Sequence, residues 1–133
     1  MIEKLVYDQL HTDSATVAIV GDRIYPALFP QGVVLPRVLI RRVGSSRGYS
    51  TEGENGLQSA SVLTQCQASD YESVKSLAAA VATALSGFRG EVLGKTVAGI
   101  FLENEVDTED YPQFGNEVAI HSVDQVWLCW WNN

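Results

Sequence analysis

The sequence has few basic residues and no long apolar run, and each shortage excludes a class of protein. Nine Lys and Arg residues stand against sixteen Asp and Glu residues. The resulting net charge of −7 argues against a general nucleic-acid binder, which needs clustered cations to contact phosphates. No stretch approaches the roughly 20 apolar residues of a membrane span, and Glu3 and Asp8 stand where a signal peptide would have its apolar run. We therefore expect a cytosolic protein that is not associated with a membrane.

Cysteine is equally scarce, since Cys66 and Cys129 are the only two and lie far apart in the sequence. Neither belongs to a CxxC or CxxH pattern of the kind that holds zinc. In a reducing compartment such cysteines behave as small buried apolar groups. No Walker loop, dinucleotide-binding fingerprint or HExxH motif occurs either. We therefore predict no metal site and no cofactor.

The composition is that of an ordinary globular protein, with 46% apolar and 19% charged residues. The 133 residues contain no internal repeat and no low-complexity linker. We therefore expect residues 1–133 to form one domain.

Helical patterns occur in three places. Apolar residues recur at helical spacing near the N-terminus, at Ile2, Leu5, Val6 and Leu10. Asp13 or Ser14 can cap a short helical turn that ends at Gly21. The strongest pattern covers residues 71–85, where a capping-box sequence begins at Ser69 and Gly87 follows the last turn. We expect two main helices, at the N-terminus and at 71–85.

Strand patterns cover residues 37–43, 57–68, 97–106 and 118–131. The polar residues 44–56 predict a long loop, in which Asn55 and Gly56 favour a tight hairpin turn. Residues 21–36 are rich in proline and predict an irregular connection, and residues 107–117 predict an acidic loop. This order of elements predicts an α+β fold, an antiparallel sheet of about four strands with two main helices packed on one face.

Two motifs suggest chemistry but lack the context that the chemistry needs. Residues 44–48 match the GxSxG nucleophile elbow, with Ser46 as the nucleophile. That turn requires a following helix, whereas a polar, turn-rich segment follows here. His121 and Asp124 have an odd spacing, which places them on opposite faces of a strand. We therefore predict no catalytic site.

Charged residues of opposite sign are segregated along the chain. The basic cluster, in one predicted strand and the loop after it, consists of Arg37, Arg41, Arg42 and Arg47. The acidic cluster, in a later strand and its loop, consists of Glu103, Glu105, Asp107, Glu109 and Asp110, and Glu117 follows in the same loop. These clusters are either solvated, or salt-bridged within one subunit, or in contact between subunits. In the last case a head-to-tail contact could close into a ring.

Aromatic residues supply further candidates for a subunit interface. All three tryptophans lie near the C-terminus, with Trp127 and Trp131 on one face of a predicted strand and Trp130 on the other. Packing against the helices explains one face, and an intersubunit contact would explain the other. Phe29 lies in the apolar segment that either covers the core or awaits a partner. We include Phe29, Trp130 and Trp131 with the two charged clusters as candidate interface residues.

Several segments of the sequence carry a family resemblance. The most specific are Val20–Pro26 (VGDRIYP), Phe29–Gly32 (FPQG) and Leu35–Val38 (LPRV). Ser61–Cys66, Ala68–Lys75 and His121–Leu128 follow in the expected order as a strand, a helix start and a closing strand. Together these segments resemble the bacteriophage tail-completion proteins, also described as tail-terminator-like or head–tail joining proteins of long-tailed phages.

The resemblance implies a virion structural protein, made in the host bacterial cytoplasm and located at the head–tail junction. It implies a homo-oligomeric ring, generally of six subunits, that completes the tail tube and docks it to the head connector (stopper or adaptor) protein. It implies no catalytic residues, so we expect no enzyme. DNA would pass through the channel without specific binding, and we hypothesise an acidic lining that keeps it from sticking.

Two alternatives remain at this point. One is a small cytosolic hydrolase that uses Ser46 or a loop carboxylate, and a helix after residue 48 would support it. The other is a peptide-binding module that uses the apolar residues 27–35. A peptide binder should have an open sheet edge, whereas a ring subunit covers its edges with its neighbours.

Overall fold

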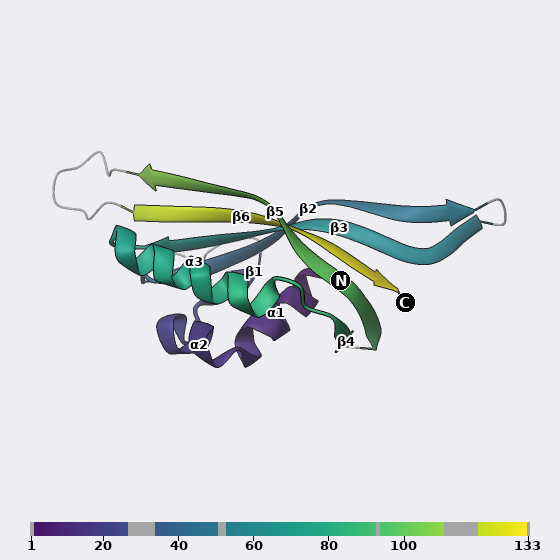
Figure 1. Ribbon diagram of the computed structural model, residues 1–133. Helices are drawn as coiled ribbons and strands as arrows, with labels where there is room; N and C mark the ends of the chain where they lie inside the picture. The colour runs from purple at the N-terminus through teal and green to yellow at the C-terminus, as the bar shows by residue number, and fades with distance from the viewer. Residues whose placement is uncertain (1, 27–33, 51–52, 93, 111–119, 133) are drawn as a thin grey trace.

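The computed structural model describes residues 2–26, 34–50, 53–92, 94–110 and 120–132, with the backbone alone for residues 45–50, 53–57, 92, 95 and 110. Six strands form one curled sheet, and three helices pack on one of its faces (Figure 1). The helices are α1 (Ile2–Thr12), α2 (Ser14–Val20) and α3 (Tyr71–Leu85). The strands are β1 (Ile24–Pro26), β2 (Arg37–Ser50), β3 (Gly53–Ala68), β4 (Gly90–Val92), β5 (Lys95–Asp110) and β6 (Ile120–Asn132).

The sheet has the strand order β1-β2-β3-β6-β5-β4. β1 runs parallel to β2, whereas the other neighbouring pairs are antiparallel. The predicted antiparallel sheet of about four strands with two main helices is therefore wrong, because the sheet is mixed, has six strands and carries three helices. The two strands that the prediction missed, β1 and β4, have three residues each, too few to show an alternating pattern.

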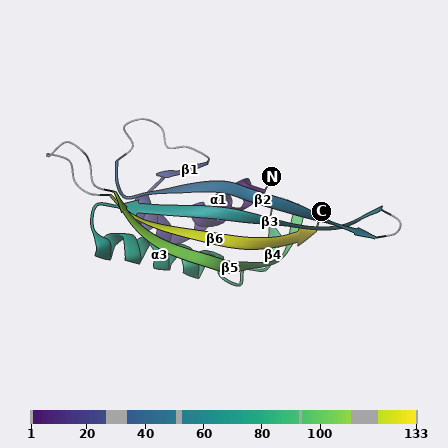
Figure 2. The same ribbon diagram turned by 90° about the horizontal axis from the view of Figure 1, so that it is seen from above.

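Two predicted loops are also wrong, because the strands beside them are longer than their apolar patterns. β2 and β3 form a hairpin that projects past the helices and includes most of residues 44–56 (Figures 1 and 2). Asn55 and Gly56 lie within β3, so the turn predicted there is wrong, and residues 51–52 lie outside the described residues. Likewise, β5 continues through residues 107–110. The hairpin projects beyond the helices and has no core to face, and residues 107–109 of β5 are exposed, so neither sequence needs to alternate.

The helix starts follow from side chains that accept hydrogen bonds from free backbone amides. Asp13 caps α2, as predicted, by accepting from the Thr16 amide at 3.0 Å. Asp70 caps α3 by accepting from the Ser73 amide at 3.0 Å, so the cap lies one residue after the predicted Ser69. Gly21 follows α2 with a φ of 62°, which suits glycine. None of the helices in the described residues is long and apolar enough to cross a membrane.

The core lies between the helices and one face of the sheet, which we call the helix face. On this face β3 contributes Ala60, Val62, Thr64, Cys66 and Ala68, and β6 contributes Val123, Gln125, Trp127, Cys129 and Trp131. The alternation predicted for residues 60–68 is confirmed. No helix or strand of the described chain covers the opposite face, which we call the open face (Figure 1). Exposed side chains on the open face are therefore available to a partner, whereas Leu39, Ser59 and Ser122 on this face are buried.

Candidate functional site

The acidic cluster lies on β5, along an edge of the sheet. β4 pairs with residues 95–97 only, and beyond them no described strand borders this edge of β5. The side chains of residues 101–109 are exposed on both faces, and Phe101, Leu102 and Val106 are 53%, 42% and 45% exposed. Long edge strands with apolar side chains invite pairing with another chain. This edge is therefore the first candidate for an assembly surface.

A β-bulge at Glu103 divides the acidic cluster between the two faces of the sheet. After the bulge, Glu105, Asp107 and Glu109 lie on the helix face, as their register with β6 shows. Glu103 lies on the open face, where its Oε1 accepts a hydrogen bond from Ser61 Oγ at 3.0 Å. The two groups of acids therefore face different surroundings. Asp110 has its backbone in β5, and its side chain lies outside the described residues.

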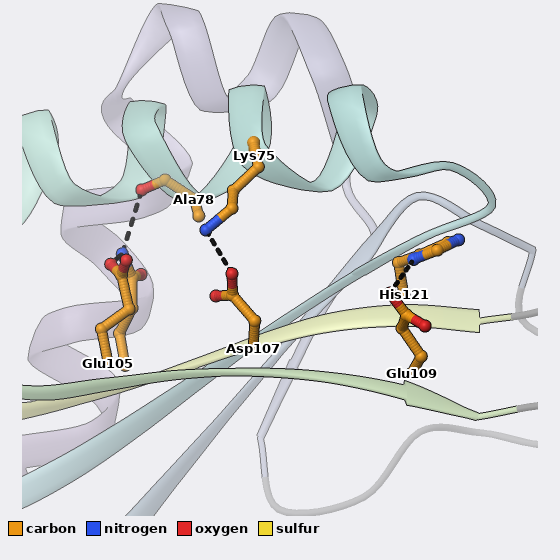
Figure 3. A network of polar contacts seen from close by, with 7 residues as sticks. Lys75, Ala78, Glu105, Asp107, Glu109 and His121 are labelled. Atoms are coloured by element: carbon orange, nitrogen blue, oxygen red, sulfur yellow. Dashed lines mark hydrogen bonds and ion pairs between the residues drawn. The ribbon is translucent and has the colours of Figure 1, made fainter.

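The acids on the helix face have partners within the chain (Figure 3). Lys75 of α3 forms an ion pair with Asp107, and this hydrogen-bonded contact raises the pKa of Lys75. His121 Nδ1 lies 3.7 Å from Glu109 Oε1. These contacts connect the second half of β5 to α3 and β6. Glu103 differs, since it makes no ion pair within the described residues.

Gln125, buried in β6, connects the acidic strand to the core. Its Nε2 donates hydrogen bonds to Glu105 Oε2 at 2.9 Å and to the Ala78 carbonyl oxygen at 3.2 Å. Thr64 Oγ1 donates to Gln125 Oε1 at 3.3 Å, and Trp127 Nε1 donates to Thr64 Oγ1 at 3.0 Å. Buried polar groups are costly unless they are hydrogen-bonded, so this network fixes β3, β6, α3 and β5 in one arrangement. Gln125 was not among the predicted site residues, although a polar residue on the apolar face of a predicted strand is a usable signal.

The two cysteines are buried on the helix face and unpaired. Burial, with the charges of Asp124 and Glu105, raises the pKa of Cys66. Burial, with the charge of Glu103, raises the pKa of Cys129 to about 12. Both thiols therefore stay protonated and unreactive at neutral pH.

The basic cluster lies on β2, which is separated from β5 by β3 and β6. A salt-bridged pair of strands within one subunit, one of the three interpretations above, is therefore wrong. Arg37 Nε donates to Gln67 Oε1 at 2.8 Å. Arg41 and Arg42 are exposed and make no hydrogen bond or ion pair within the described chain. Arg47 has its backbone in β2, and its side chain lies outside the described residues.

The tryptophans divide between the two faces as the strand pattern predicts. Trp127 is fully buried on the helix face, and Trp131 lies there at 6% exposure. Trp130 lies on the open face between Ser59 and Gly99 of the neighbouring strands and is partly exposed. Of the two tryptophans proposed for an interface, Trp130 is thus on the available surface and Trp131 is in the core. Phe29, the third aromatic candidate, lies outside the described residues.

The structure also tests the motifs that suggested chemistry. Residues 45–50 continue β2, so no helix follows Ser46 and the chain does not form a nucleophile elbow there. His121 lies on the helix face and Asp124 on the open face, as their spacing predicts. Within the described part of the chain, no group of three His, Cys, Asp or Glu residues could hold a metal ion.

A hollow of about 360 Å³ lies between the start of α3 and the ends of β5 and β6. Its lining includes Tyr71, Asp107, Glu109 and His121. Asp107 and Glu109 already face Lys75 and His121 respectively. The hollow therefore belongs to the internally paired part of the acidic strand.

Comparisons with known proteins identify a matching family and a similar fold. A family model described as "Tail completion protein gp17" matches residues 4–123. Among solved structures, a chain from the "Virion of native gene transfer agent (GTA) particle" superposes with a TM-score of 0.68 at 18% sequence identity. The match covers 96% of this chain and 92% of that chain, and at this identity it shows a shared fold. No sequence among the curated proteins matches.

Proposed function

The chain belongs to the tail completion protein gp17 family, and from this premise we propose that its copies form a ring that completes the tail tube and joins it to the head connector. The chain is a structural protein of a phage or phage-like tail, and the family match over residues 4–123 carries this conclusion. Because the family is a structural one, we also propose that the chain is not an enzyme.

The proposed ring has six subunits, each a single domain of residues 1–133, and sits at the head–tail junction of the virion after synthesis in the host cytoplasm. Its partners would be the tail tube protein and the head connector protein. The similar chain from a gene transfer agent virion supports assembly in a particle of this kind. Two free sheet edges of opposite charge suit a head-to-tail repeat, the type of contact that closes into rings.

The proposed subunit contacts draw on the basic and acidic clusters, with Trp130 on the open face. Open edges alone do not favour the peptide-binding alternative, because a ring subunit has open edges until its neighbours cover them. Acidic residues outside the contacts would line the channel and let DNA pass without binding. Neutralising the acidic cluster should then slow DNA delivery, and unchanged infectivity would count against the lining.

Deletion of the gene from its parent phage or prophage tests the proposed role. Electron microscopy of the lysate should show filled heads apart from tails, or tails of uncontrolled length, because neither the tube nor the head would have its joining ring. Expression of the intact chain from a plasmid is the control and should restore complete particles. Normal particles without the gene would contradict the proposal.

A further inference from the structure

The β2 edge and the β5 edge of the sheet carry opposite charges. Along the strand direction, their unpaired stretches overlap. β1 borders β2 only at residues 38–40, and β4 borders β5 only at residues 95–97. From residue 41 of β2 onwards, and from residue 98 of β5 onwards, no described strand covers the outer edge. The two open stretches overlap across the middle of the sheet.

The strand register shows which residues lie at that common level. Reading across the sheet, Arg41 is opposite Leu63, Leu63 is opposite Val126, and Val126 is opposite Asn104. Arg42, the next residue of β2, is level with Leu102 of β5 through Val62 and Trp127. Glu103, at the bulge between Leu102 and Asn104, is therefore level with Arg41 and Arg42. Arg41 and Glu103 also share the open face, since each is on the side of β3 that carries Ser61 and Leu63.

Exposed apolar side chains match at the next level. Val43, the extra residue at a bulge in β2, is 57% exposed. The residues at this level on β5 are Phe101 and Leu102, which are also exposed. Each edge strand thus carries one charged residue and an adjacent apolar residue in the same order, and the charges are opposite. The Glu103 carboxylate lies over the open face, where it accepts the hydrogen bond from Ser61 of β3.

We infer that the β2 edge of one copy packs against the β5 edge of a second copy, with Arg41 and Val43 facing Glu103 and Phe101. Charge complementarity selects this occupant, because two β5 edges would oppose acids to acids and two β2 edges would oppose arginines to arginines. The contact is therefore head-to-tail, as a closed ring requires. It rests on the proposed function and narrows the subunit interface to four residues.

The strand directions agree with this contact. β2, β3, β6 and β5 alternate in direction, so β2 and β5 run antiparallel within one chain. A copy repeated by rotation, without inversion, places its β2 antiparallel to the neighbour's β5 and continues the pattern. Both edges carry bulges at this level, which interrupt a regular hydrogen-bond ladder. Side chains, rather than an unbroken ladder, therefore carry the contact.

Disulfide cross-linking tests the contact directly in assembled particles. The variant Arg41→Cys/Glu103→Cys, oxidised in particles from the parent phage or prophage, should give a ladder of covalent oligomers on a non-reducing gel. The two sites lie three strand spacings apart in one chain, about 14 Å along the sheet, whereas a disulfide needs Cα atoms within about 7 Å. Any bond must therefore join two copies. Native Cys66 and Cys129 are buried and should not contribute.

The matched controls separate this contact from its alternatives. Either single cysteine should give monomers, and Arg41→Cys/Glu72→Cys, with the second site exposed on α3, should give no ladder. Dimers from a single cysteine would mean that like edges meet, which would overturn the inference. A missing ladder in intact particles would overturn the contact but not the joining role, since the gene deletion tests that role independently.

Charge exchange gives a second measurement that does not depend on disulfide geometry. Arg41→Glu or Glu103→Arg alone places like charges together and should lower the yield of infectious particles by at least about tenfold. The combined Arg41→Glu/Glu103→Arg variant restores the opposite charges in every contact and should recover most of the yield. Circular dichroism should show that each variant is folded. If the combined variant is folded and still gives a low yield of infectious particles, the pairing of Arg41 with Glu103 is contradicted.

Discussion

β6 and β5 are neighbouring antiparallel strands, yet one is built for the fold and the other for contact outside it. β6 has a paired strand on each side, and alternate residues of it are buried beneath the helices. β5 is paired on one side along most of its length, and residues 101–109 are exposed on both faces. The difference shows that two paired strands can have different sequence patterns: alternate residues are buried on β6, whereas residues 101–109 of β5 are all exposed. Apolar residues on β6 stabilise the monomer, as do Val97 and Ile100 at the start of β5, while Phe101, Leu102 and Val106 farther along β5 are exposed.

This contrast is sharpest where the two strands are in direct register. Trp127 of β6 stands opposite Leu102 of β5. The indole is fully buried and hydrogen-bonded to Thr64, whereas the leucine side chain is 42% exposed. If the comparison is correct, substitutions at such paired positions should have very different effects on the free energy of unfolding.

The largest effect is expected for Trp127→Ala. Truncation leaves a cavity in the core and removes the hydrogen bond to Thr64, so the free energy of unfolding should fall by about 3–5 kcal/mol. Leu102→Ala, its register partner, should cost much less, about 1 kcal/mol, because 42% of the leucine surface is already exposed. Urea unfolding followed by circular dichroism measures both. Equal losses would mean that β5 contributes to the core at residue 102 as β6 does at residue 127.

A second paired position tests the polar network. Gln125→Ala removes the donor to Glu105 and Ala78 and the acceptor for Thr64, and should cost about 1–3 kcal/mol because buried groups lose their partners. Glu105→Gln on β5 keeps an acceptor at the same place and should cost less than about 1 kcal/mol, since that side chain is exposed and can rearrange. The same urea titration checks both variants. A larger loss of unfolding free energy for Glu105→Gln than for Gln125→Ala would mean that the network depends more on the β5 residue than on the β6 residue.

The same contrast explains how far the sequence predicts this fold. The predicted helices and the alternation of residues 60–68 appear in the structure because their apolar periodicity reflects burial in the core. Residues 44–50 and 107–110 were read as loops, although they are strands. The first segment projects past the helices (Figure 1), and residues 107–109 are exposed on an edge strand, so neither sequence needs to alternate. The prediction fails where structure is maintained by backbone pairing rather than by burial.

The candidate surfaces were predictable in part for a related reason. Segregated charge is visible in a sequence, so both clusters could be named without a structure. Whether β2 and β5 were neighbours depended on the strand order, which is set by the long-range pairing of β3 with β6. The same pairing places Arg41 level with Glu103, a relation between residues 62 positions apart that no local pattern encodes.

The smallest expected effect concerns the contact that crosses from α3 to β5. Lys75→Met keeps the aliphatic stem but removes the ion pair with Asp107, and should lower Tm only slightly, because exposed ion pairs contribute little. Asp107 raises the pKa of Lys75. This contribution is therefore present below the unfolded pKa of lysine, about 10.4, and is lost as the pH rises through the higher folded pKa.

Thermal unfolding of Lys75→Met and of Lys4→Met, an exposed lysine on α1, separates this ion pair from a general effect of charge. The difference between the two variants should be small at neutral pH. It should vanish once the lysine is deprotonated, and it should shrink at about 1 M salt, where exposed charges are screened. A drop in Tm as large as that of Gln125→Ala would show that α3 holds β5 in place. Contacts within the subunit would then fix β5 as firmly as they fix β6. The exposed residues of β5 would form a rigid edge for the next subunit.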